Sequence, residues 1–339
     1  MALRVLVTGG AGFIGSHLVD ALLADGHEVR VLDDLSVGSR GNLAEAEATG
    51  RLTFVLGSIT DPATVAAAVE GTSHVFHLAV QCVRRSLRLP IESHDVNATG
   101  TLLLLEAARA AKVDRFVYCS SSEVYGNAST GRLLEDQTVC QPMTVYGAAK
   151  LAGELYTDAY LRTYELPTTV VRPFNAYGPR AYHFGTRAEV LPRFVNRVLN
   201  GLPPVIFGDP SNGRDFTYVT ELAHGIKLAG FEPGLVGQRV NLAYGRMVTV
   251  GEIADRVLAA LGRNDLTVAI HGARPGDVHQ LHADTAKANR LMGYTANIAF
   301  EEGLERYLAW VRRTYPDPKV LIEDTIENWT VPTGSTRLS

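Results

Sequence analysis

The chain has 339 residues, of which 46% are hydrophobic, so it can bury a large core and has room for one large domain and a smaller one. Its formal net charge of −4 gives no electrostatic reason to expect binding to nucleic acid or to an anionic membrane. The three cysteines, at positions 82, 119 and 140, show no metal-ligand spacing, so we expect no metal site and a reduced, cytoplasmic environment. No apolar run approaches the roughly 20 residues of a membrane span. A strand is expected to begin within three residues of Met1, which leaves no room for a signal peptide.

The first elements in chain order are an apolar strand over residues 3–7 and an amphipathic helix over residues 12–24. Gly9, Gly12 and Gly15 occupy the turn between them and the start of the helix. Glycines at these positions let a strand turn tightly into a helix, and they let backbone N–H groups approach a pyrophosphate. The pattern is typical of dinucleotide-binding folds.

An acidic residue follows at the sequence distance expected in a dinucleotide-binding fold. A second strand is expected over residues 28–32, and Asp33 comes directly after it, eighteen residues past Gly15. In dinucleotide-binding folds a carboxylate at this place takes the hydroxyls of the adenosine ribose. Asp34 adds negative charge, and no basic residue occurs between it and Arg40, so a 2′-phosphate would be repelled. We therefore expect NAD rather than NADP as the cofactor.

Strand and helix patterns continue to alternate along the first half of the chain. Further strands are expected over residues 52–56, 74–78, 116–120 and 168–172, and further helices over residues 62–69, 91–111 and 146–164. Such alternation predicts an α/β fold of the Rossmann type, a doubly wound parallel sheet with helices on both faces.

The pattern changes after Arg172, where Gly- and Pro-rich turns separate shorter elements. Helices are expected near residues 187–200, 219–230, 250–261 and 301–314. Thr249 and Glu252 have the spacing of a capping box at the start of the third of these helices. This half predicts a smaller α/β domain made from C-terminal segments.

Tyr146 and Lys150 lie one turn apart at the start of an expected helix, so both side chains project from one face. A phenol with a pKa of about 10 acts as a base at neutral pH only if a nearby cation stabilises the phenolate. Lys150 would do this and would also hold the nicotinamide ribose. Upstream, the polar segment 120–123 follows a buried strand, so it emerges at the carboxyl edge of the sheet, where ligands bind. We expect its side chains to join Tyr146 and Lys150 at this edge.

These features, in this order, resemble the extended short-chain dehydrogenase/reductase family, in its branch of nucleotide-sugar epimerases, dehydratases and decarboxylases. The resemblance covers residues 3 to about 312. Besides the segments above, it rests on His77-Leu78-Ala79, Val96-Asn97-Ala98-Thr99-Gly100-Thr101, Arg172-Pro173-Phe174-Asn175-Ala176-Tyr177-Gly178-Pro179-Arg180, Arg214-Asp215-Phe216-Thr217-Tyr218-Val219 and Arg274-Pro275-Gly276-Asp277. It implies an enzyme that uses NAD to modify a nucleoside-diphosphate sugar, most often a UDP-sugar.

The resemblance also implies which residues bind the cofactor. Besides the glycines, the two aspartates, Tyr146 and Lys150, these are Phe13, Ile14, Leu35, Ser58, Ile59, Leu78, Ala79, Val80, Asn97, Ser120 and Pro173. Two of them depart from the family pattern. Ser58 stands where the family often has an Asp that faces the adenine, and Val80 replaces a usual Ala. Neither change removes a main anchor of the cofactor.

For the substrate, the resemblance implies that Asn175, Arg214 and Arg274 hold the diphosphate, because guanidinium groups suit a dianionic pyrophosphate. The strand that contains Val205 and Phe207 resembles the one on which the family packs the nucleotide base. Further contacts to the substrate are expected from Arg85, Arg187 and Val190.

Three parts of the chain follow from this assignment. Residues 1–173 form the NAD-binding domain, to which some later segments return, and residues 174–314 mainly form the sugar-nucleotide domain. Residues 315–339 form an extended tail. Members of the family usually form homodimers, and here the interface would consist of the helices near residues 99–111 and 147–163. Their free faces are apolar, with Leu102, Leu103, Leu155 and Tyr156.

The resemblance implies a shared first step. Tyr146, as the phenolate, takes the proton of the sugar C4 hydroxyl while hydride passes from C4 to NAD and Ser121 hydrogen-bonds the same oxygen. The residue types at positions 122 and 123, here Ser122 and Glu123, then distinguish between the reactions that can follow this step. The run Ser-Glu-Val-Tyr-Gly most resembles UDP-glucuronate decarboxylases, in which a cation for the C6 carboxylate is also expected. Candidates for that cation are Arg85, His183 and Arg187.

Four alternatives remain. A 4,6-dehydratase commonly carries Asp-Glu rather than Ser-Glu at this place, although some carry Ser-Glu. In a 4-epimerase, Glu123 would only pair with an arginine at the wall of the cleft. A catalytically silent NAD-binding regulator is disfavoured by the intact set of Ser121, Tyr146 and Lys150. A reductase of non-sugar carbonyls would be expected to prefer NADPH and to lack the diphosphate-binding arginines.

Overall fold

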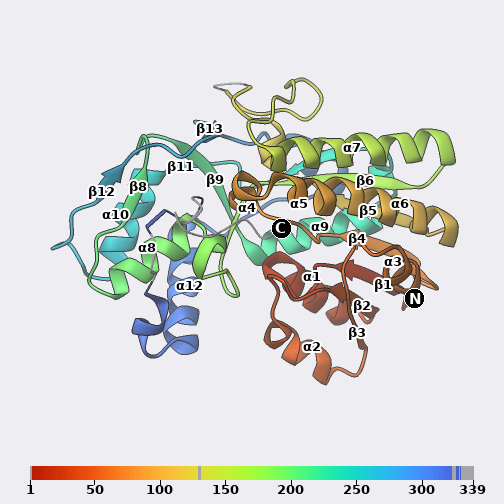
Figure 1. The fold of residues 1–339 in the computed structure, drawn as a ribbon, viewed down its shortest axis with the longest axis horizontal. Helices are drawn as coiled ribbons and strands as arrows, with labels where there is room; N and C mark the ends of the chain where they lie inside the picture. The colour runs from red at the N-terminus through yellow and green to blue at the C-terminus, as the bar shows by residue number, and fades with distance from the viewer. Residues whose placement is uncertain (1, 129–130, 323–325, 328, 330–339) are drawn as a thin grey trace.

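The computed structural model describes residues 2–128, 131–322, 326–327 and 329. Its larger body is built on a seven-stranded sheet with the order β10-β6-β5-β4-β1-β2-β3, in which every neighbouring pair is parallel (Figure 1). The strands are β1 (Arg4–Thr8), β2 (Glu28–Asp33), β3 (Leu52–Leu56), β4 (His74–His77), β5 (Arg115–Cys119), β6 (Thr168–Pro173) and β10 (Arg239–Leu242). The predicted Rossmann-type fold is confirmed.

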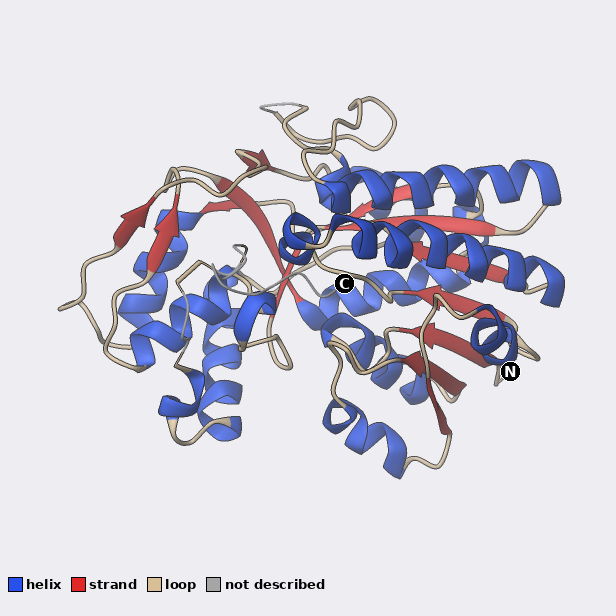
Figure 2. Ribbon diagram, in the orientation of Figure 1, coloured by secondary structure: helices blue, strands red, loops and turns tan. Residues whose placement is uncertain are grey.

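Helices cover both faces of this sheet, which is why β5 and β6 are buried at every residue (Figure 2). One face carries α3 (Pro62–Val69), α6 (Gly100–Ala111) and α7 (Val145–Tyr164), and the other carries α1 (Phe13–Ala24) and α9 (Val219–Phe231). The short helices α2 (Ala44–Ala48) and α11 (Ala286–Met292) also belong to this body. Both α9 and β10 follow residue 173, so later parts of the chain complete the first body.

The strand order reverses between β1 and β4, since β2 and β3 extend the sheet on one side and β5, β6 and β10 extend it on the other. At such a switch point the connections leave in opposite directions, and a crevice opens outside the carboxyl ends of the strands. The glycine-containing turn of residues 9–12 leaves β1 at this crevice. The loop after β4 faces the same opening and leads into α4 (Val83–Arg88).

The helix expected over residues 91–111 contains one irregular turn. It consists of α5 (Pro90–His94), a π-helical turn (Asp95–Thr99) and α6. In the wider turn, the buried side chain of Asn97 points toward the loop after β4: its Oδ1 accepts from the N–H of Gln81 at 3.0 Å, and its Nδ2 donates to the Gln81 carbonyl at 3.0 Å. The helix predicted over residues 91–111 is therefore present, and the π turn is a local feature that a periodicity pattern does not register.

The smaller body has its own core between short strands and three helices. One sheet joins β7 (Asn175–Tyr177), β9 (Gly213–Tyr218), β11 (Met247–Thr249) and β13 (Gln280–Leu281), and a parallel pair joins β8 (Val205–Phe207) and β12 (Ala269–His271). The helices are α8 (Val190–Leu199), α10 (Val250–Ala260) and α12 (Phe300–Thr314). The capping box predicted at the start of α10 is present.

The predicted tail of residues 315–339 lies partly outside the described residues. In its described part, Pro318–Leu321 form a 3-10 turn, and the side chain of Leu321 is buried in the core of the smaller body. Among the described residues, none of the helices is long and apolar enough to cross a membrane.

Candidate active site

A cavity of about 410 Å³ runs from the crevice of the larger body into the smaller one, a volume typical of small-molecule sites. Most of the residues predicted to bind cofactor or substrate line it. They are Gly9, Gly12, Phe13, Ile14, Gly15, Asp33, Asp34, Ser58, Ile59, Leu78, Ala79, Val80, Ser120, Ser121, Ser122, Glu123, Tyr146, Lys150, Pro173, Asn175, Arg187, Val190, Val205, Phe207, Arg214 and Arg274. The fold thus brings together residues that lie up to 265 positions apart in the sequence, from Gly9 to Arg274.

Three predicted residues do not line the cavity. Arg85 points away and forms an ion pair with Glu92 at 2.6 Å. Its neighbour Arg84 lines the cavity instead, because successive residues of a helix point about 100° apart. Asn97 hydrogen-bonds to the backbone of Gln81 in the loop after β4, and Leu35 packs against the core of the larger body. These positions correct the direct contacts expected for the three residues.

His183, a further candidate cation, is buried away from the cavity. Its Nδ1 hydrogen-bonds to Oδ1 of Asn196 at 2.7 Å, and its Nε2 hydrogen-bonds to the Tyr307 hydroxyl at 2.8 Å. Burial lowers the pKa of His183 to about 4, so the ring is neutral near pH 7. It therefore belongs to the core of the smaller body and does not supply a charge to the site.

The glycine turn leaves no room for side chains. A Cβ on Gly9, whose φ is +70°, would lie 2.7 Å from the backbone nitrogen of Ala79. A Cβ on Gly15 would lie 2.1 Å from the Gly9 carbonyl oxygen. The backbone of the turn can therefore approach a ligand closely, as the pyrophosphate of a dinucleotide requires.

Asp33 ends β2 with its carboxylate fixed by two backbone groups. Oδ2 accepts from the N–H of Ala11 at 3.0 Å, and Oδ1 accepts from the N–H of Leu35 at 2.9 Å. Burial raises the pKa of this carboxyl, and the two hydrogen bonds oppose that rise. The carboxylate and the glycine turn together form a cradle that fits the adenosine half of NAD.

Tyr146 and Lys150 lie in the first turns of α7, whose N-terminus is capped by the Thr144 hydroxyl accepting from the N–H of Gly147 at 3.1 Å. Both side chains line the cavity, as predicted from their spacing. Burial raises the pKa of the Tyr146 phenol, and a hydrogen bond with the Ser121 side chain lowers it. Burial also lowers the pKa of Lys150 to about 8. Burial thus disfavours the charged form of both groups: it opposes the phenolate of Tyr146 and brings the pKa of Lys150 closer to neutral pH.

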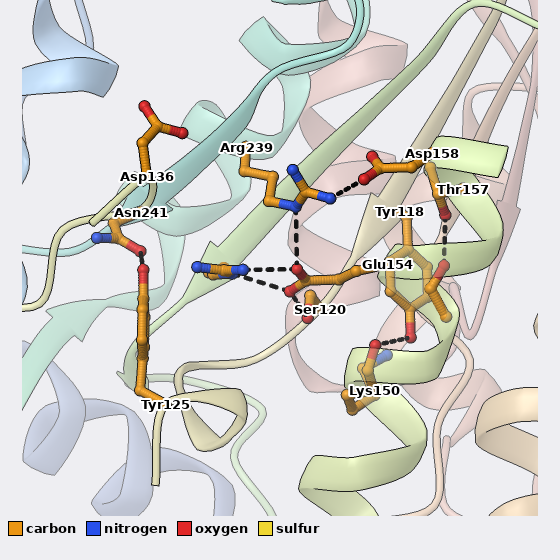
Figure 3. A network of polar contacts seen from close by, with 12 residues as sticks. Tyr118, Ser120, Tyr125, Asp136, Lys150, Glu154, Thr157, Asp158, Arg239 and Asn241 are labelled. Carbon is orange, nitrogen blue, oxygen red and sulfur yellow. Dashed lines mark hydrogen bonds and ion pairs between the residues drawn. The ribbon is translucent and has the colours of Figure 1, made fainter. Parts of the chain in front are cut away.

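A buried ion network lies behind this pair (Figure 3). Glu154, one turn after Lys150 on α7 and fully buried, accepts hydrogen bonds from Ser120 Oγ at 2.5 Å and from Nε and Nη2 of Arg172 at 2.9 and 2.6 Å. Arg239 adds a contact at 3.3 Å. The network fixes the end of β5, where the serines emerge, against the helix that carries Tyr146 and Lys150. It was not predicted, because nothing in the local sequence indicates that Glu154 faces inward.

Glu123 lines the same cavity in a half-buried position. Burial raises the pKa of its carboxyl, whereas Arg214 and Arg274 lower it. These two arginines share one partner, Oδ1 of Asp277, at 3.2 and 2.9 Å. The pair predicted to hold a diphosphate thus converges beside Glu123, and Asp277 keeps the guanidinium groups in place.

Several residues that line the cavity were not predicted from the sequence. They include Arg84, Tyr182, Glu189, Arg193, Asp277 and Trp329. Only Asp277 carried a local signal, since it closes the segment that begins at Arg274. The others reach the cavity through tertiary packing alone.

Comparisons with known proteins agree on one family. Residues 5–243 match the model of the NAD dependent epimerase/dehydratase family. The chain is 38% identical to a UDP-glucose 4-epimerase of Mycolicibacterium smegmatis over 313 residues, which cover 91% of this chain and 99% of the relative. Its structure resembles that of a dTDP-glucose 4,6-dehydratase of Streptomyces venezuelae with NAD bound, at a TM-score of 0.88, 34% identity and coverage of 94% and 100%. It also resembles a UDP-glucose 4-epimerase of Thermotoga maritima with UDP-glucose, at a TM-score of 0.86, 32% identity and coverage of 92% and 99%.

Proposed function

Because the chain belongs to the NAD dependent epimerase/dehydratase family, we propose that it oxidises C4 of UDP-glucuronate and then releases the C6 carboxylate as CO2. The family expected from the sequence, the extended short-chain dehydrogenase/reductases that act on nucleotide sugars, is confirmed, and the cofactor is NAD. Decarboxylation is the finer part of the proposal. The observation that carries it is the presence of Glu123 in the same cavity as Ser121, Tyr146 and Lys150.

In the first step, the Tyr146 phenolate accepts the proton of the C4 hydroxyl, and the Lys150 ammonium stabilises the phenolate. The Ser121 hydroxyl donates a hydrogen bond to the C4 oxygen and orients the sugar. NAD, when bound in the cradle of Gly9 and Asp33, supplies the acceptor for the C4 hydride. Oxidation leaves a ketone at C4, which places the C6 carboxylate β to a carbonyl.

In the second step, the C5–C6 bond breaks and its electron pair moves into the C4 carbonyl as CO2 leaves. The resulting enolate then takes a proton at C5. Glu123 is the group proposed to supply that proton, because burial raises the pKa of its carboxyl and favours the protonated form. Arg84 and Arg187 line the cavity and are the proposed cations for the C6 carboxylate, in place of Arg85 and His183.

A 4-epimerase is the second candidate, and the relatives at 38% and 32% identity favour it. In that case, Glu123 would serve only as a charge partner of Arg214 and Arg274, which already influence its pKa. No proton transfer would then depend on its carboxylate. The two candidates therefore differ in what Glu123 does.

Incubating the enzyme with UDP-glucuronate, UDP-glucose and dTDP-glucose and measuring product masses tests the proposal. Loss of CO2 from UDP-glucuronate is the expected result. Loss of water from dTDP-glucose would identify a dehydratase, and conversion of UDP-glucose to its C4 epimer at unchanged mass would identify an epimerase. Either of these results without loss of CO2 would contradict the decarboxylase assignment.

The variant Glu123→Gln tests the second step alone. We expect nicotinamide absorbance to rise with UDP-glucuronate, because Tyr146 and Lys150 still act at C4, while little CO2 is released. Tyr146→Phe is the control, since it should block the rise in absorbance as well. Full activity of the Gln variant would show that the carboxylate takes no part in proton transfer.

A further inference from the structure

Two aromatic rings from distant parts of the chain meet in the part of the cavity that lies in the smaller body. Phe207 comes from β8, and Trp329 comes from the C-terminal tail. Their ring centroids are 4.4 Å apart and their planes are at 86°, so the rings form two walls of a corner. Both residues line the cavity and neither is fully buried, so each presents surface to a ligand.

Helix α8 guides the tail to this corner. At the C-terminal end of the helix, Asn200 Nδ2 donates to the Pro318 carbonyl at 2.8 Å. Seven residues earlier, the Arg193 guanidinium donates to the Ile326 carbonyl. Residues seven apart lie on the same face of a helix, about 10 Å apart along its axis. Pro318 and Ile326 of the tail therefore lie along α8, the first at the end of the helix and the second near the turns that line the cavity.

The anchor at Arg193 joins the tail to the corner itself. Arg193 is only 8% exposed, and its guanidinium carbon lies 5.7 Å from the centroid of the Phe207 ring. The same side chain thus contacts one wall of the corner and holds the tail three residues before the other wall. Leu321, buried in the core of the smaller body, fixes the tail between the two anchors. Trp329 therefore follows an anchored part of the tail and contacts the Phe207 ring.

The chemistry of the lining indicates which part of a ligand would lie there. Arg214 and Arg274 supply two guanidinium groups for a diphosphate. The neighbouring surface of the smaller body, with Val205, Phe207 and Val250, is apolar and aromatic. A charged diphosphate suits the arginines, and a flat, uncharged ring system suits the aromatic corner.

We propose that Trp329 is part of the nucleotide-base subsite, where the base of the nucleoside diphosphate packs against the indole and the Phe207 ring. This inference rests on the proposed function, because it takes the substrate to be a nucleotide sugar. It assigns the tail a direct role in substrate binding. Trp329, the last residue that the structure describes, lines the same cavity as Gly9 near the start of the chain.

Binding of UDP, followed by calorimetry, tests the role of Trp329. Trp329→Ala should raise the Kd for UDP about 10-fold or more, as expected for the loss of one base–aromatic contact, and leave NAD binding unchanged. Trp329→Phe should restore most of the affinity. Ile326→Ala is the matched control: its side chain is 42% exposed and its backbone carbonyl is retained, so UDP affinity should stay at the wild-type value.

Tryptophan fluorescence tests whether UDP contacts Trp329. The chain has two tryptophans, so Trp310→Phe leaves Trp329 as the only indole. UDP should then change the tryptophan fluorescence with the same Kd that calorimetry gives. Unchanged or tighter binding of UDP to Trp329→Ala would overturn the inference, and tighter binding would show that the tail competes with the nucleotide. Failure of the wild-type protein to bind UDP, with NAD still bound, would instead overturn the proposed substrate and the base subsite with it.

Discussion

Replacing Glu154 by Gln should destabilise the protein strongly, because this carboxylate is the shared partner of two arginines in a buried network. Glu154 is fully buried, and the side chain of Arg172 is 3% exposed. The two side chains form a bidentate contact, with Arg172 Nε at 2.9 Å and Nη2 at 2.6 Å from the carboxylate oxygens. Gln has nearly the same volume, so the substitution removes the charge and one acceptor without opening a cavity.

The size of the loss in stability depends on the buried charge of Arg172, which the substitution leaves without its partner. Breaking a buried ion pair by removing one partner typically costs about 3–5 kcal/mol, because the other charge stays buried without compensation. Arg239 is 24% exposed and keeps its contact with Asp158, so its share of the loss is small. We therefore expect the free energy of unfolding of Glu154→Gln to fall by about 3–5 kcal/mol, with Arg172 responsible for most of the decrease.

Urea unfolding followed by circular dichroism measures this difference. The matched control is Glu302→Gln on α12, which removes the partner of Arg306 in a pair whose side chains are 52% and 51% exposed. Exposed pairs contribute about 0–1 kcal/mol, so this variant should unfold close to the wild type. A loss below about 1 kcal/mol for Glu154→Gln would refute the reasoning, because the buried guanidinium of Arg172 would then be tolerated without its partner.

The same variant has a second readout, in the pH dependence of activity. Burial lowers the pKa of Lys150 to about 8, and the charge of Glu154 opposes that lowering. Removing the charge should lower this pKa further. Lys150 is charged only below its pKa, so the activity that depends on it should be lost at a lower pH than in the wild type. A profile that does not move would separate the stability role of Glu154 from any effect on the catalytic lysine.

Three further predictions concern the site and the assembly. Tyr146→Phe should lower kcat by about 10²–10⁴-fold or more while NAD stays bound, which steady-state kinetics and calorimetry check; near-normal turnover would exclude the phenol as the base. Gly15→Ala should abolish NAD binding in calorimetry, because its Cβ would lie 2.1 Å from the Gly9 carbonyl oxygen; retained affinity would show that the turn can relax. Leu155, which is 58% exposed on α7, belongs to the face expected to form a homodimer, so Leu155→Glu should shift the sedimentation of a dimer to that of a monomer, and a monomeric wild type would exclude this interface.

The parts of the site that sequence predicts well are those whose signal is local. The glycine turn, Asp33, and the pair Tyr146 and Lys150 each lie within a few residues of a strand end or a helix start. Because the carboxyl ends of parallel strands share one edge, recognising the strands was enough to place these residues together. Ser121 and Glu123 follow the end of β5 and reach the cavity for the same reason.

The residues that were misplaced or missed depend on information that no local pattern contains. Arg84 and Arg85 are adjacent in a short helix, and only its rotation against the rest of the fold decides which one faces the cavity. His183 was judged by its charge, but burial next to Tyr307 makes it neutral. Trp329 reaches the site in a tail that α8, far away in the sequence, contacts at two places.

The π-helical turn Asp95–Thr99 has a consequence for how this fold tolerates changes in length. A π turn accommodates one residue more than a regular helix, so deleting one residue from it is the change that the helix absorbs most easily. Such a deletion would turn Asp95–Thr99 into regular helix and leave α5 and α6 on their present faces, but it would withdraw Asn97 from its place in the wider turn. The hydrogen bonds between Asn97 and Gln81 would then be lost, and the part of the cavity lining that contains Arg84 would change its position. Loss of a single codon is thus a route by which descendants of this chain could acquire a differently shaped substrate cavity while their nucleotide-binding sheet stays intact.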